Sequence, residues 1–505
     1  MTTVQVRSPG PVADERRWKA LAVCLTAGFM TLLDTSIVNV ALPSMERGLH
    51  APQADLSWVA SGYALTYGLF LVPSGRLGDL RGRRETFLTG VALFTLTSAA
   101  CGLAPTSGWL VVFRLLQGVA GGMIAPQGSG LIQQMFRGAE RARAFGMFGS
   151  VVAISTAVGP LAGGLLIEAS GSWRWVFFVN LPIGVAVFVT ALRLLPGSPP
   201  KDSREGYDVP GVLLLGFGAM ALMLPLVQEQ AWHGRSKWAL VPLAVVLLLA
   251  FWAWERRQGL RGRAPLVDLR LFNRRSFTCG SLLSLVYFAG FTSLFFVYTL
   301  FLQNTLDYSA LEAGLAAMPF AVGSAVAALV GGRLVVRYGR KLVVWGLSAV
   351  TVGLLGAAVA VRLVPGVGVG WAAALPLLLA GVGSGLTTSP NTTLTLARVP
   401  VRRAGAAGGV LQMGQRVGSA AGIAAVGSVY FAHLANHGSA AGALQLGLLA
   451  ALLFVLAGLA LAVADLREPA TERSPEHRED PRTGHVNPEG HDGRAADEPR
   501  SPSRP

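Results

Sequence analysis

Charged residues are scarce in this sequence. Asp, Glu, Lys and Arg make up 14% of the 505 residues, whereas 52% of the residues are hydrophobic. Ordinary soluble domains have about a quarter of their residues charged, because a folded surface has to be solvated. The composition therefore excludes an ordinary soluble globular protein.

Cysteine is also scarce, and the motifs of several kinds of site are missing. Cys24, Cys101 and Cys279 lie inside apolar runs without metal or redox spacing, which favours small packing residues over disulfides. No glycine-rich phosphate loop ends in Gly-Lys-Ser/Thr, so we do not expect ATP to be the energy source. His433 and His437 have i,i+4 spacing but no evident third ligand. We expect no metal, no cofactor and no enzymatic activity.

Long apolar runs are what the sequence has instead. Each is about 18 to 25 residues long, enough to cross a bilayer as a helix. The first run has no cleavage site after it, which favours a retained helix over a secretory signal. The sequence predicts an all-α membrane protein with fourteen transmembrane helices, near residues 18–42, 56–75, 86–104, 108–134, 142–167, 174–195, 209–228, 237–255, 276–302, 311–331, 341–362, 371–396, 405–432 and 440–464.

The basic residues are distributed unevenly between the two sides of these predicted helices. Six alternate loops, beginning with the second, hold 24 of the 42 Lys and Arg residues, and the other seven loops hold five. This asymmetry predicts that the basic loops and both termini are cytoplasmic. The net charge of +15 then follows from topology and implies no nucleic-acid partner. Contact of the basic segments with anionic lipid headgroups remains open.

Two short segments resemble each other, which indicates an internal repeat. "GRLGDLRGRR" (75–84) and "GRLVVRYGRK" (332–341) each follow a predicted helix and share glycines and basic residues. A duplicated six-helix half is the plan of many secondary transporters, whose substrate site lies between the halves. The predicted divisions are an N-terminal arm, a first six-helix bundle, an inserted helix pair, a second bundle and a disordered tail: 1–17, 18–195, 196–275, 276–466 and 467–505.

Four motifs make the chain similar to the major facilitator superfamily, and within it to the fourteen-span drug:proton antiporters. They are "LDTSIVNVALP" (33–43), a loop motif, "RLLQGVAGGMIAPQG" (114–128) and "GMFGSVVAISTAVGPLAGG" (146–164). The loop motif implies a conformational switch at Gly75, Asp79, Gly82, Arg83 and Arg84. The last motif is associated with exporters in that family, and its matching residues are Gly146, Gly159, Pro160, Gly163 and Gly164. In the second loop copy Val336 replaces the aspartate, so we expect the switch to be one-sided.

Asp34 is the only acidic residue well inside a predicted helix. Apolar surroundings disfavour a charged carboxylate, so such a group can bind and release a proton. Arg114 is its natural candidate partner, since an arginine inside a membrane helix normally faces the protein and a partner. Competition between a proton and a cationic substrate for Asp34 would give antiport. The alternative is that Asp34 is a purely structural, hydrogen-bonded group.

Other candidates for substrate contact are less specific. We name Gln117, Asn391 and Arg416 beside Asp34. Arg416 could bind an anionic group of a substrate, or bond to a backbone carbonyl and hold the second bundle together. Asn391 lies in the polar run 387–395, which could equally join helices. Aromatic side chains could stack on a flat substrate, or simply fill the core: Tyr63, Tyr67, Phe291 and Phe295.

Taken together, these features predict a proton-coupled antiporter that exports small amphipathic compounds, drugs or antibiotics, across a bacterial plasma membrane. Its partners would be the substrate, protons and lipid, and no oligomer is required. Two alternatives stay open. One is an uptake symporter of the same fold for an organic anion, and the other is a non-transporting sensor or scaffold that acts through the tail.

Overall fold

The computed structural model describes most of the chain up to Leu466. The described residues are 12–197, 206–228, 232, 234–261, 263, 265–364, 366, 368–436 and 438–466. Within them the regular elements are all helical. The predicted tail 467–505 and the first eleven residues of the predicted arm lie outside the described residues.

The helices fall into three consecutive groups along the chain. The N-terminal helices are α1 (Val12–Leu49), α2 (Gln53–Arg81), α3 (Arg83–Gly102), α4 (Ser107–Met135), α5 (Gly138–Ser170), α6 (Trp175–Phe178) and α7 (Asn180–Leu194). The inserted helices are α8 (Val209–Val227) and α9 (Leu240–Leu260), with the 3-10 turn η1 (Arg235–Ala239) between them. The C-terminal helices are α10 (Arg275–Thr305), α11 (Ala310–Tyr338), α12 (Arg340–Leu363), α13 (Val369–Ala372), α14 (Ala374–Leu396), α15 (Ala404–Ala435) and α16 (Ala440–Leu466), with the 3-10 turns η2 (Leu269–Leu271) and η3 (Val401–Arg403).

Each of the fourteen predicted runs coincides with a long helix, preceded by a short one in the runs 174–195 and 371–396. In the described part of the chain, twelve helices are long and apolar enough to cross a membrane. The long helices α3 and α14 are not apolar enough by the same measure. Their polar side chains are turned inward: Thr97 and Ser98 of α3 and Thr387 and Thr395 of α14 are buried. Polar groups that pack against protein lower a helix's hydropathy without exposing those groups to lipid.

Large apolar side chains cover the outer surface of the helices. Leu165, Trp371 and Leu453 are exposed by 68%, 86% and 68% respectively. Exposed apolar side chains over so much of a surface are unfavourable in water and favourable in hydrocarbon. The described helices therefore form an all-α, multi-pass membrane protein.

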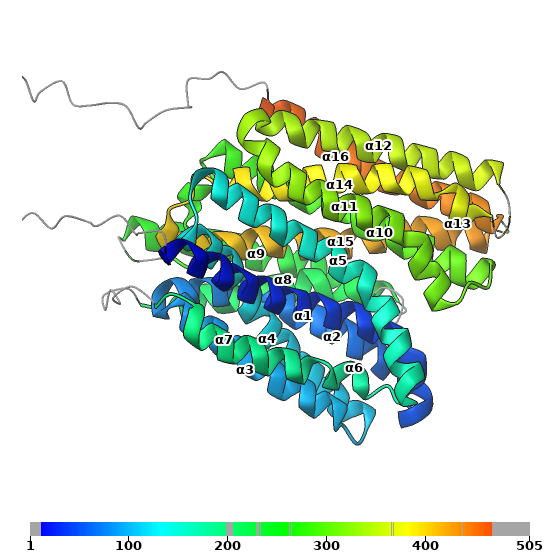
Figure 1. Cartoon of the computed structure of the whole chain (residues 1–505), viewed down its shortest axis with the longest axis horizontal. Coiled ribbons are helices and arrows are strands. Elements are labelled where there is room, and N and C mark those ends of the chain that lie inside the picture. Colours follow the sequence, from blue (N-terminus) through cyan, green and yellow to red (C-terminus); the bar gives the residue numbers. More distant parts are fainter. Residues whose placement is uncertain are drawn as a thin grey trace, which may run out of the picture. The chain divides into compact units, whose positions relative to one another are not determined.

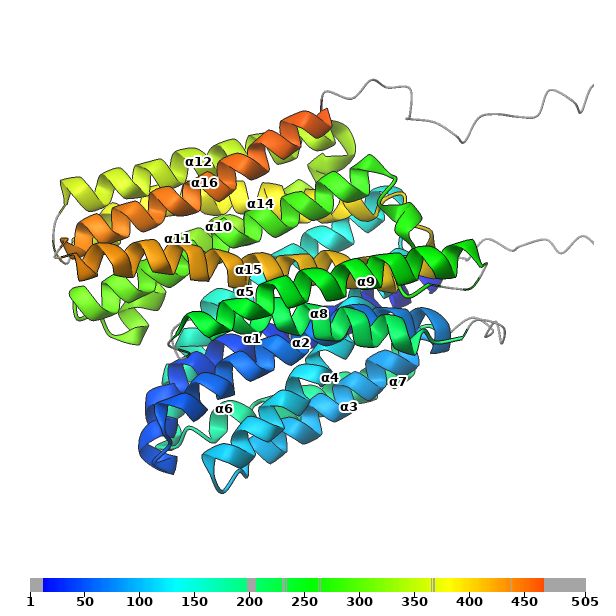
Figure 2. The ribbon, with the colours of Figure 1, turned by 180° about the vertical axis from the view of Figure 1, so that it is seen from behind.

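The helix packing of the first group is repeated in the last. Among the N-terminal helices, α1 packs on α5 and α7, α2 packs on α4, and α3 packs on α4 and α7. Among the C-terminal helices, α10 packs on α15 and α16, α11 packs on α14, and α12 packs on α14 and α16. Figures 1 and 2 show the two groups from opposite sides. The inserted helix α8 packs on α9, and it also contacts α2 and α15.

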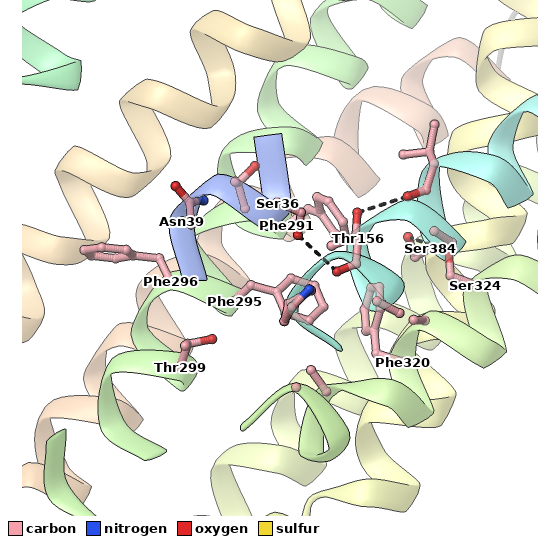
Figure 3. A pocket seen from close by; sticks show the side chains of 18 of the residues that line it. Ser36, Asn39, Thr156, Phe291, Phe295, Phe296, Thr299, Phe320, Ser324 and Ser384 are labelled. Atoms are coloured by element: carbon pink, nitrogen blue, oxygen red, sulfur yellow. Dashed lines mark hydrogen bonds between the residues drawn. The ribbon is translucent and has the colours of Figure 1, made fainter. Parts of the chain in front are cut away.

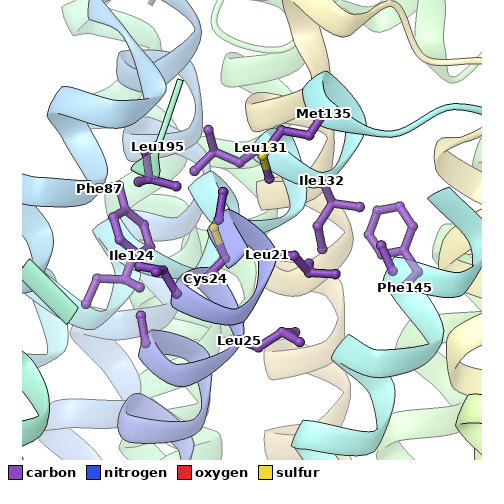
Figure 4. Close-up of a cluster of buried hydrophobic side chains, with 14 of the residues drawn as sticks. Leu21, Cys24, Leu25, Phe87, Ile124, Leu131, Ile132, Met135, Phe145 and Leu195 are labelled. Atoms are coloured by element: carbon purple, nitrogen blue, oxygen red, sulfur yellow. The ribbon is translucent and has the colours of Figure 1, made fainter. Parts of the chain in front are cut away.

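A buried hydrophobic cluster joins the N-terminal helices near the turn between α2 and α3. Leu21 and Cys24 of α1, Phe87 of α3, Ile124 of α4 and Phe145 of α5 lie in this cluster (Figure 4). Cys24 and Cys101 are buried, and the three cysteines are free. The cysteines thus serve as small packing residues at these positions.

The N-terminal and C-terminal helices meet chiefly along two pairs, α2 with α15 and α5 with α11, and α5 also contacts α14 and α4 contacts α15. The first glycine of each repeated loop segment lies at one of these crossings. A Cβ atom on Gly332 of α11 would lie 2.9 Å from the Cα atom of Gly146 in α5. A Cβ atom on Gly75 of α2 would overlap the backbone carbonyl of Gly405 in α15. The backbones touch here, so only glycine fits without separating the helices.

We expect Gly146→Leu to destabilise the folded protein by about 1 to 3 kcal/mol, because the added side chain overpacks the α5–α11 crossing. The measurement is the unfolding midpoint of the purified protein in detergent. Gly164→Leu is the matched control, since a Cβ atom at Gly164 of the same helix has nothing within 4 Å. Equal midpoints for the two variants would contradict the close packing at Gly146.

Candidate functional site

Asp34 and Arg114 form an ion pair inside the N-terminal helices. Arg114 Nη1 of α4 lies 2.6 Å from Asp34 Oδ2 of α1, and the two side chains are 1% and 0% exposed. Arg114 Nε also donates to the backbone carbonyl of Val59 in α2 at 3.0 Å. The pair thus ties three helices together, and it is shielded from solvent and lipid.

Three further polar side chains complete the hydrogen bonding around Asp34. Gln117 Nε2 donates to Asp34 Oδ1 at 3.0 Å, and Gln117 Oε1 accepts from Arg114 Nη1 at 2.8 Å. Asn180 Nδ2, at the start of α7, donates to Asp34 Oδ1 at 2.9 Å and to Ser98 Oγ of α3 at 3.1 Å. Arg114 and Gln117 are three residues apart, so both side chains leave the same face of α4. Both carboxylate oxygens therefore accept hydrogen bonds, Oδ1 from Gln117 and Asn180 and Oδ2 from Arg114.

Two tyrosines of α2 connect this network to the C-terminal helices. The guanidinium of Arg114 lies 4.1 Å from the centre of the Tyr63 ring, and Tyr63 Oη donates to the backbone carbonyl of Thr31 at 3.2 Å. The rings of Tyr63 and Tyr67 are 5.8 Å apart. The guanidinium of Arg416, on α15, lies 4.6 Å from the centre of the Tyr67 ring. A continuous row of contacts therefore runs from Asp34 to Arg416.

A central cavity with two adjoining lobes lies between the N-terminal and C-terminal helices. The phenylalanine lobe has a volume of about 500 Å³, and its lining includes Phe291, Phe295 and Phe320 (Figure 3). The arginine lobe has a volume of about 300 Å³, and its lining includes Tyr67 and Arg416. The lobes share part of their lining: Ser36, Asn39, Gly149, Val152, Thr156, Phe288, Phe291, Thr292, Phe295 and Thr388.

The cavity is aromatic, with polar groups contributed by several helices. The rings of Phe295 and Phe320 are 4.9 Å apart and nearly perpendicular, and those of Phe291 and Phe295 are 5.4 Å apart. The polar side chains labelled in Figure 3 are Ser36, Asn39, Thr156, Thr299, Ser324 and Ser384. A mainly apolar pocket of this size with a few polar groups is suited to a drug-sized organic molecule.

Of the four polar candidates for substrate contact, only Arg416 lines this cavity. Of the aromatic candidates, Tyr67, Phe291 and Phe295 line it and Tyr63 does not. Asp34 and Gln117 belong to the sealed network and line neither lobe. Asn391 also lines neither lobe. Its amide nitrogen donates to the backbone carbonyl of Gly280 at 2.9 Å, and its Oδ1 accepts from Arg340 Nη1 at 2.5 Å. Asn391 therefore joins helices α10, α12 and α14.

The predicted switch residues lie where α2 meets the start of α15. Asp79 accepts hydrogen bonds from the backbone nitrogens of Gly405 at 3.0 Å and Ala406 at 2.9 Å. Arg83 Nη2 lies 2.7 Å from Asp79 Oδ1, and the same nitrogen bonds to the backbone carbonyl of Val401. A carboxylate at a helix N-terminus satisfies free N–H groups and complements the helix dipole. This cluster, Asp79 with Arg83 and the start of α15, is called the latch below.

The other switch residues have different partners. Gly82 has a φ of 117°, and it joins α2 directly to α3. Arg84 Nη2 donates to the backbone carbonyl of Leu192 in α7 at 2.5 Å. In the second copy, Arg340 occupies the position of Arg83 and forms an ion pair with Asp465 of α16 at 2.5 Å. Because Val336 stands at the position of Asp79, Arg340 has no aspartate on its own loop segment and pairs with Asp465 of α16 instead. This ion pair lies within the C-terminal helices.

The glycines of the predicted antiporter motif serve two interfaces of α5. Gly146 lies at the crossing with α11, and Pro160 lines the phenylalanine lobe. Gly159 and Gly163 face α1, where added Cβ atoms would overlap Ser36 and approach Ile37. Of the four matching glycines, two bring α5 close to α1, one packs on α11, and a Cβ atom on Gly164 would have nothing within 4 Å.

Several residues of the network carry no strong signal in the sequence. Asn180 and Ser98 sit in apolar runs with other small or polar residues, so nothing in their local sequence sets them apart. Asn39 and Thr156 are ordinary polar residues until the fold places them in the cavity. The partnership of Arg340 with Asp465 joins residues 125 positions apart, which no local pattern predicts.

Comparison with known proteins assigns this architecture to a family. The Major Facilitator Superfamily model matches residues 24–423 and again 281–495, and the chain belongs to this superfamily of membrane transporters. The chain is 36% identical to a "Probable actinorhodin transporter" of Streptomyces coelicolor (strain ATCC BAA-471 / A3(2) / M145) over 85% of this chain and 75% of that protein.

Two further similarities cover most of the chain. It is 33% identical to the "Tetracenomycin C resistance and export protein" of Streptomyces glaucescens over 82% of this chain and 76% of the relative. Among solved structures, the proton:xylose symporter XylE has a TM-score of 0.63 and 15% identity, with 88% of this chain and 95% of that chain covered. At that identity the likeness shows the fold alone.

We expect Arg114→Met to destabilise the protein by about 3 to 5 kcal/mol, because it leaves the Asp34 carboxylate buried without a cation. The double variant Asp34→Asn/Arg114→Met should recover part of this loss. The measurement is a double-mutant cycle of unfolding free energies in detergent. Strictly additive effects would contradict a direct, strong Asp34–Arg114 interaction.

Proposed function

We propose that the protein exports small amphipathic organic compounds, of the kind used as drugs or antibiotics, in exchange for protons. The observation that carries this proposal is the aromatic cavity between the two helix groups, separated by one row of side chains from a sealed acid–base pair. A transporter needs a substrate site that both halves share, and an antiporter also needs a group that binds protons. The cavity and Asp34 are suited to these two tasks.

The relatives support the direction of transport. One relative is named as a resistance and export protein for tetracenomycin C, and another as a "Probable actinorhodin transporter". We therefore propose that this chain also exports a bioactive compound. The uptake symporter remains the alternative, and it would move substrate the opposite way in inverted membrane vesicles.

We also propose the topology that the loop charges favour. Fourteen helices would cross the bacterial plasma membrane, α3 and α14 included, with six in each half and α8 and α9 inserted between the halves. The latch end and both termini would then be cytoplasmic. The latch, together with the glycine crossings, supports a state that is closed towards the cytoplasm.

Proton coupling would act on the network around Asp34 without direct contact between Asp34 and the substrate. Protonation removes the negative charge, so Arg114 loses its ionic partner and keeps only neutral acceptors such as Val59 and Gln117. Arg114 also packs on Tyr63, and Tyr67 lies between Tyr63 and the cavity. A shift of Arg114 would therefore move Tyr63 and Tyr67 and change the lining of the substrate site. Coupling requires such a difference in substrate contacts between the protonated and the ionised state.

The latch would control access from the cytoplasm. Asp79 holds the start of α15 through two backbone hydrogen bonds, so its release allows α2 and α15 to separate. Arg141 Nη2 of α5 adds a second link across the halves, to the backbone carbonyl of Ala397 at 3.2 Å. Because these contacts are either formed or broken, the cytoplasmic side would be either closed or open, without a continuous range of intermediate positions.

The test of the proposed exchange uses inverted vesicles with a preformed proton gradient. Export substrates from a panel of anionic, neutral and cationic drugs should dissipate the gradient with wild type and fail to do so with Asp34→Asn. Asp307→Asn is the matched control, because Asp307 is exposed in the turn between α10 and α11. Dissipation by Asp34→Asn at the wild-type rate would contradict the proton role of Asp34.

Weakening the latch should open the cytoplasmic side. We expect Asp79→Asn to raise the labelling rate of Cys24, which lines the arginine lobe, about tenfold with an impermeant maleimide added to inverted vesicles. The background is Cys101→Ser/Cys279→Ser, and exposed Arg81→Gln is the control on the same helix. An unchanged labelling rate would rule out Asp79 as the residue that holds the closed state.

The sensor alternative has its own test. Deletion of residues 467–505 should leave gradient dissipation intact in a transporter and abolish the activity of a sensor that signals through the tail. We expect the deletion variant to retain wild-type exchange.

A further inference from the structure

We propose that Arg416 forms an anion-binding subsite in the central cavity, so that the transported compounds are aromatic molecules carrying an acidic group. This inference rests on the proposed function, because it names the substrate class of that site. It differs from the expectation that a cationic substrate competes with protons for Asp34.

The charge of the cavity carries the argument. Among the described residues that line the two lobes, Arg416 is the only one with a charged side chain. The buried carboxylate of Asp34 does not offset this charge directly, because it is held by Arg114, Gln117 and Asn180 within the N-terminal helices. The positive charge of Arg416 therefore repels a cation that enters the cavity and attracts an anion. In an apolar cavity this difference is larger than it would be in water.

Arg416 is held in place and still has its donors free. In the described part of the chain, no ion pair or hydrogen bond joins its guanidinium to another residue. Its position is set by the Tyr67 ring, 4.6 Å away, and by α2, where a Cβ atom on Gly68 would lie 3.8 Å from the Cβ atom of Arg416. A guanidinium stacked on an aromatic face keeps its N–H groups available at its edge. This arrangement disfavours a role in which Arg416 joins helices by bonding to a backbone carbonyl.

The two lobes fit one molecule with an aromatic body and an acidic end. Phe291 and Phe295 line both lobes, so a ring system packed on them borders the space in front of Arg416. Phe320 extends the aromatic surface away from Arg416. A carboxylate or phenolate can accept two N–H groups of a guanidinium at once, which fixes its orientation. The ring and the charge would thus be recognised by separate parts of the same cavity.

The experiment measures binding of three probes that share one ring system and differ in charge. They are anthracenecarboxylate, hydroxymethylanthracene and aminomethylanthracene, whose fluorescence is titrated with purified protein in detergent at neutral pH. We expect wild type to bind the carboxylate at least about tenfold more tightly than the alcohol, and the ammonium compound more weakly than both.

The variants separate the charge from the cavity. Arg416→Gln should lose the preference for the carboxylate while still binding the alcohol, and Arg416→Lys should retain part of the preference. Arg337→Gln is the matched control, because Arg337 also lies over a tyrosine, at 5.3 Å from the ring centre of Tyr338, but is exposed on α11 outside the cavity. It should bind all three probes as wild type does.

Two results would overturn the anion subsite. One is a wild type that binds the carboxylate no more tightly than the alcohol or not at all, and the other is a preference that survives in Arg416→Gln. Binding is measured without a proton gradient, so this outcome is independent of the exchange assay. Carboxylate preference without proton exchange would refute the proposed function alone, and proton exchange driven by cations without this preference would refute the subsite alone.

Discussion

A buried charge must find its counter-charge inside the protein, and the rest of this structure depends on that constraint. Asp34 is fully buried, and Arg114, Gln117 and Asn180 converge on it from α4 and α7. Removal of either charge from such a pair leaves the other uncompensated, which costs far more than the intact pair contributes. The pair therefore holds the N-terminal helices in one arrangement as long as Asp34 is ionised. A proton on Asp34 is the simplest event that can change this arrangement.

The group that we propose as the proton site lies apart from the cavity that we propose as the substrate site. Asp34 lies behind Tyr63 and Tyr67, and the cavity lies in front of them. We therefore propose that proton and substrate do not compete directly for the Asp34 carboxylate. Instead, the proton at Asp34 and the substrate in the cavity each shift the position of one structural element that contacts both. That element includes α2, which carries both tyrosines and, at its other end, Asp79 of the latch. One helix thereby contacts the proton network, the cavity and the interface between the halves.

The sequence predicted the helices well, because a bilayer demands long apolar runs and these are visible directly. The importance of Asp34 and Arg114 was also predictable, since charges within such runs are costly and few. The lining of the cavity was not. Asn391 looked like a substrate ligand and instead bonds to Arg340 and the backbone of Gly280, while Asn39 became a cavity residue only through the crossing of α1 and α5. A polar side chain in a membrane helix needs a partner, but the sequence does not say whether that partner is another helix or a ligand.

The central claim is that Asp34 changes its protonation state while it remains buried against Arg114. The most direct measurement is pH-difference infrared spectroscopy of the purified protein, compared between wild type and Asp34→Asn. Lowering the pH should produce a carbonyl stretch of a protonated carboxyl group in wild type, and this band should be absent in Asp34→Asn. Identical difference spectra for the two proteins would show that another group takes up the proton.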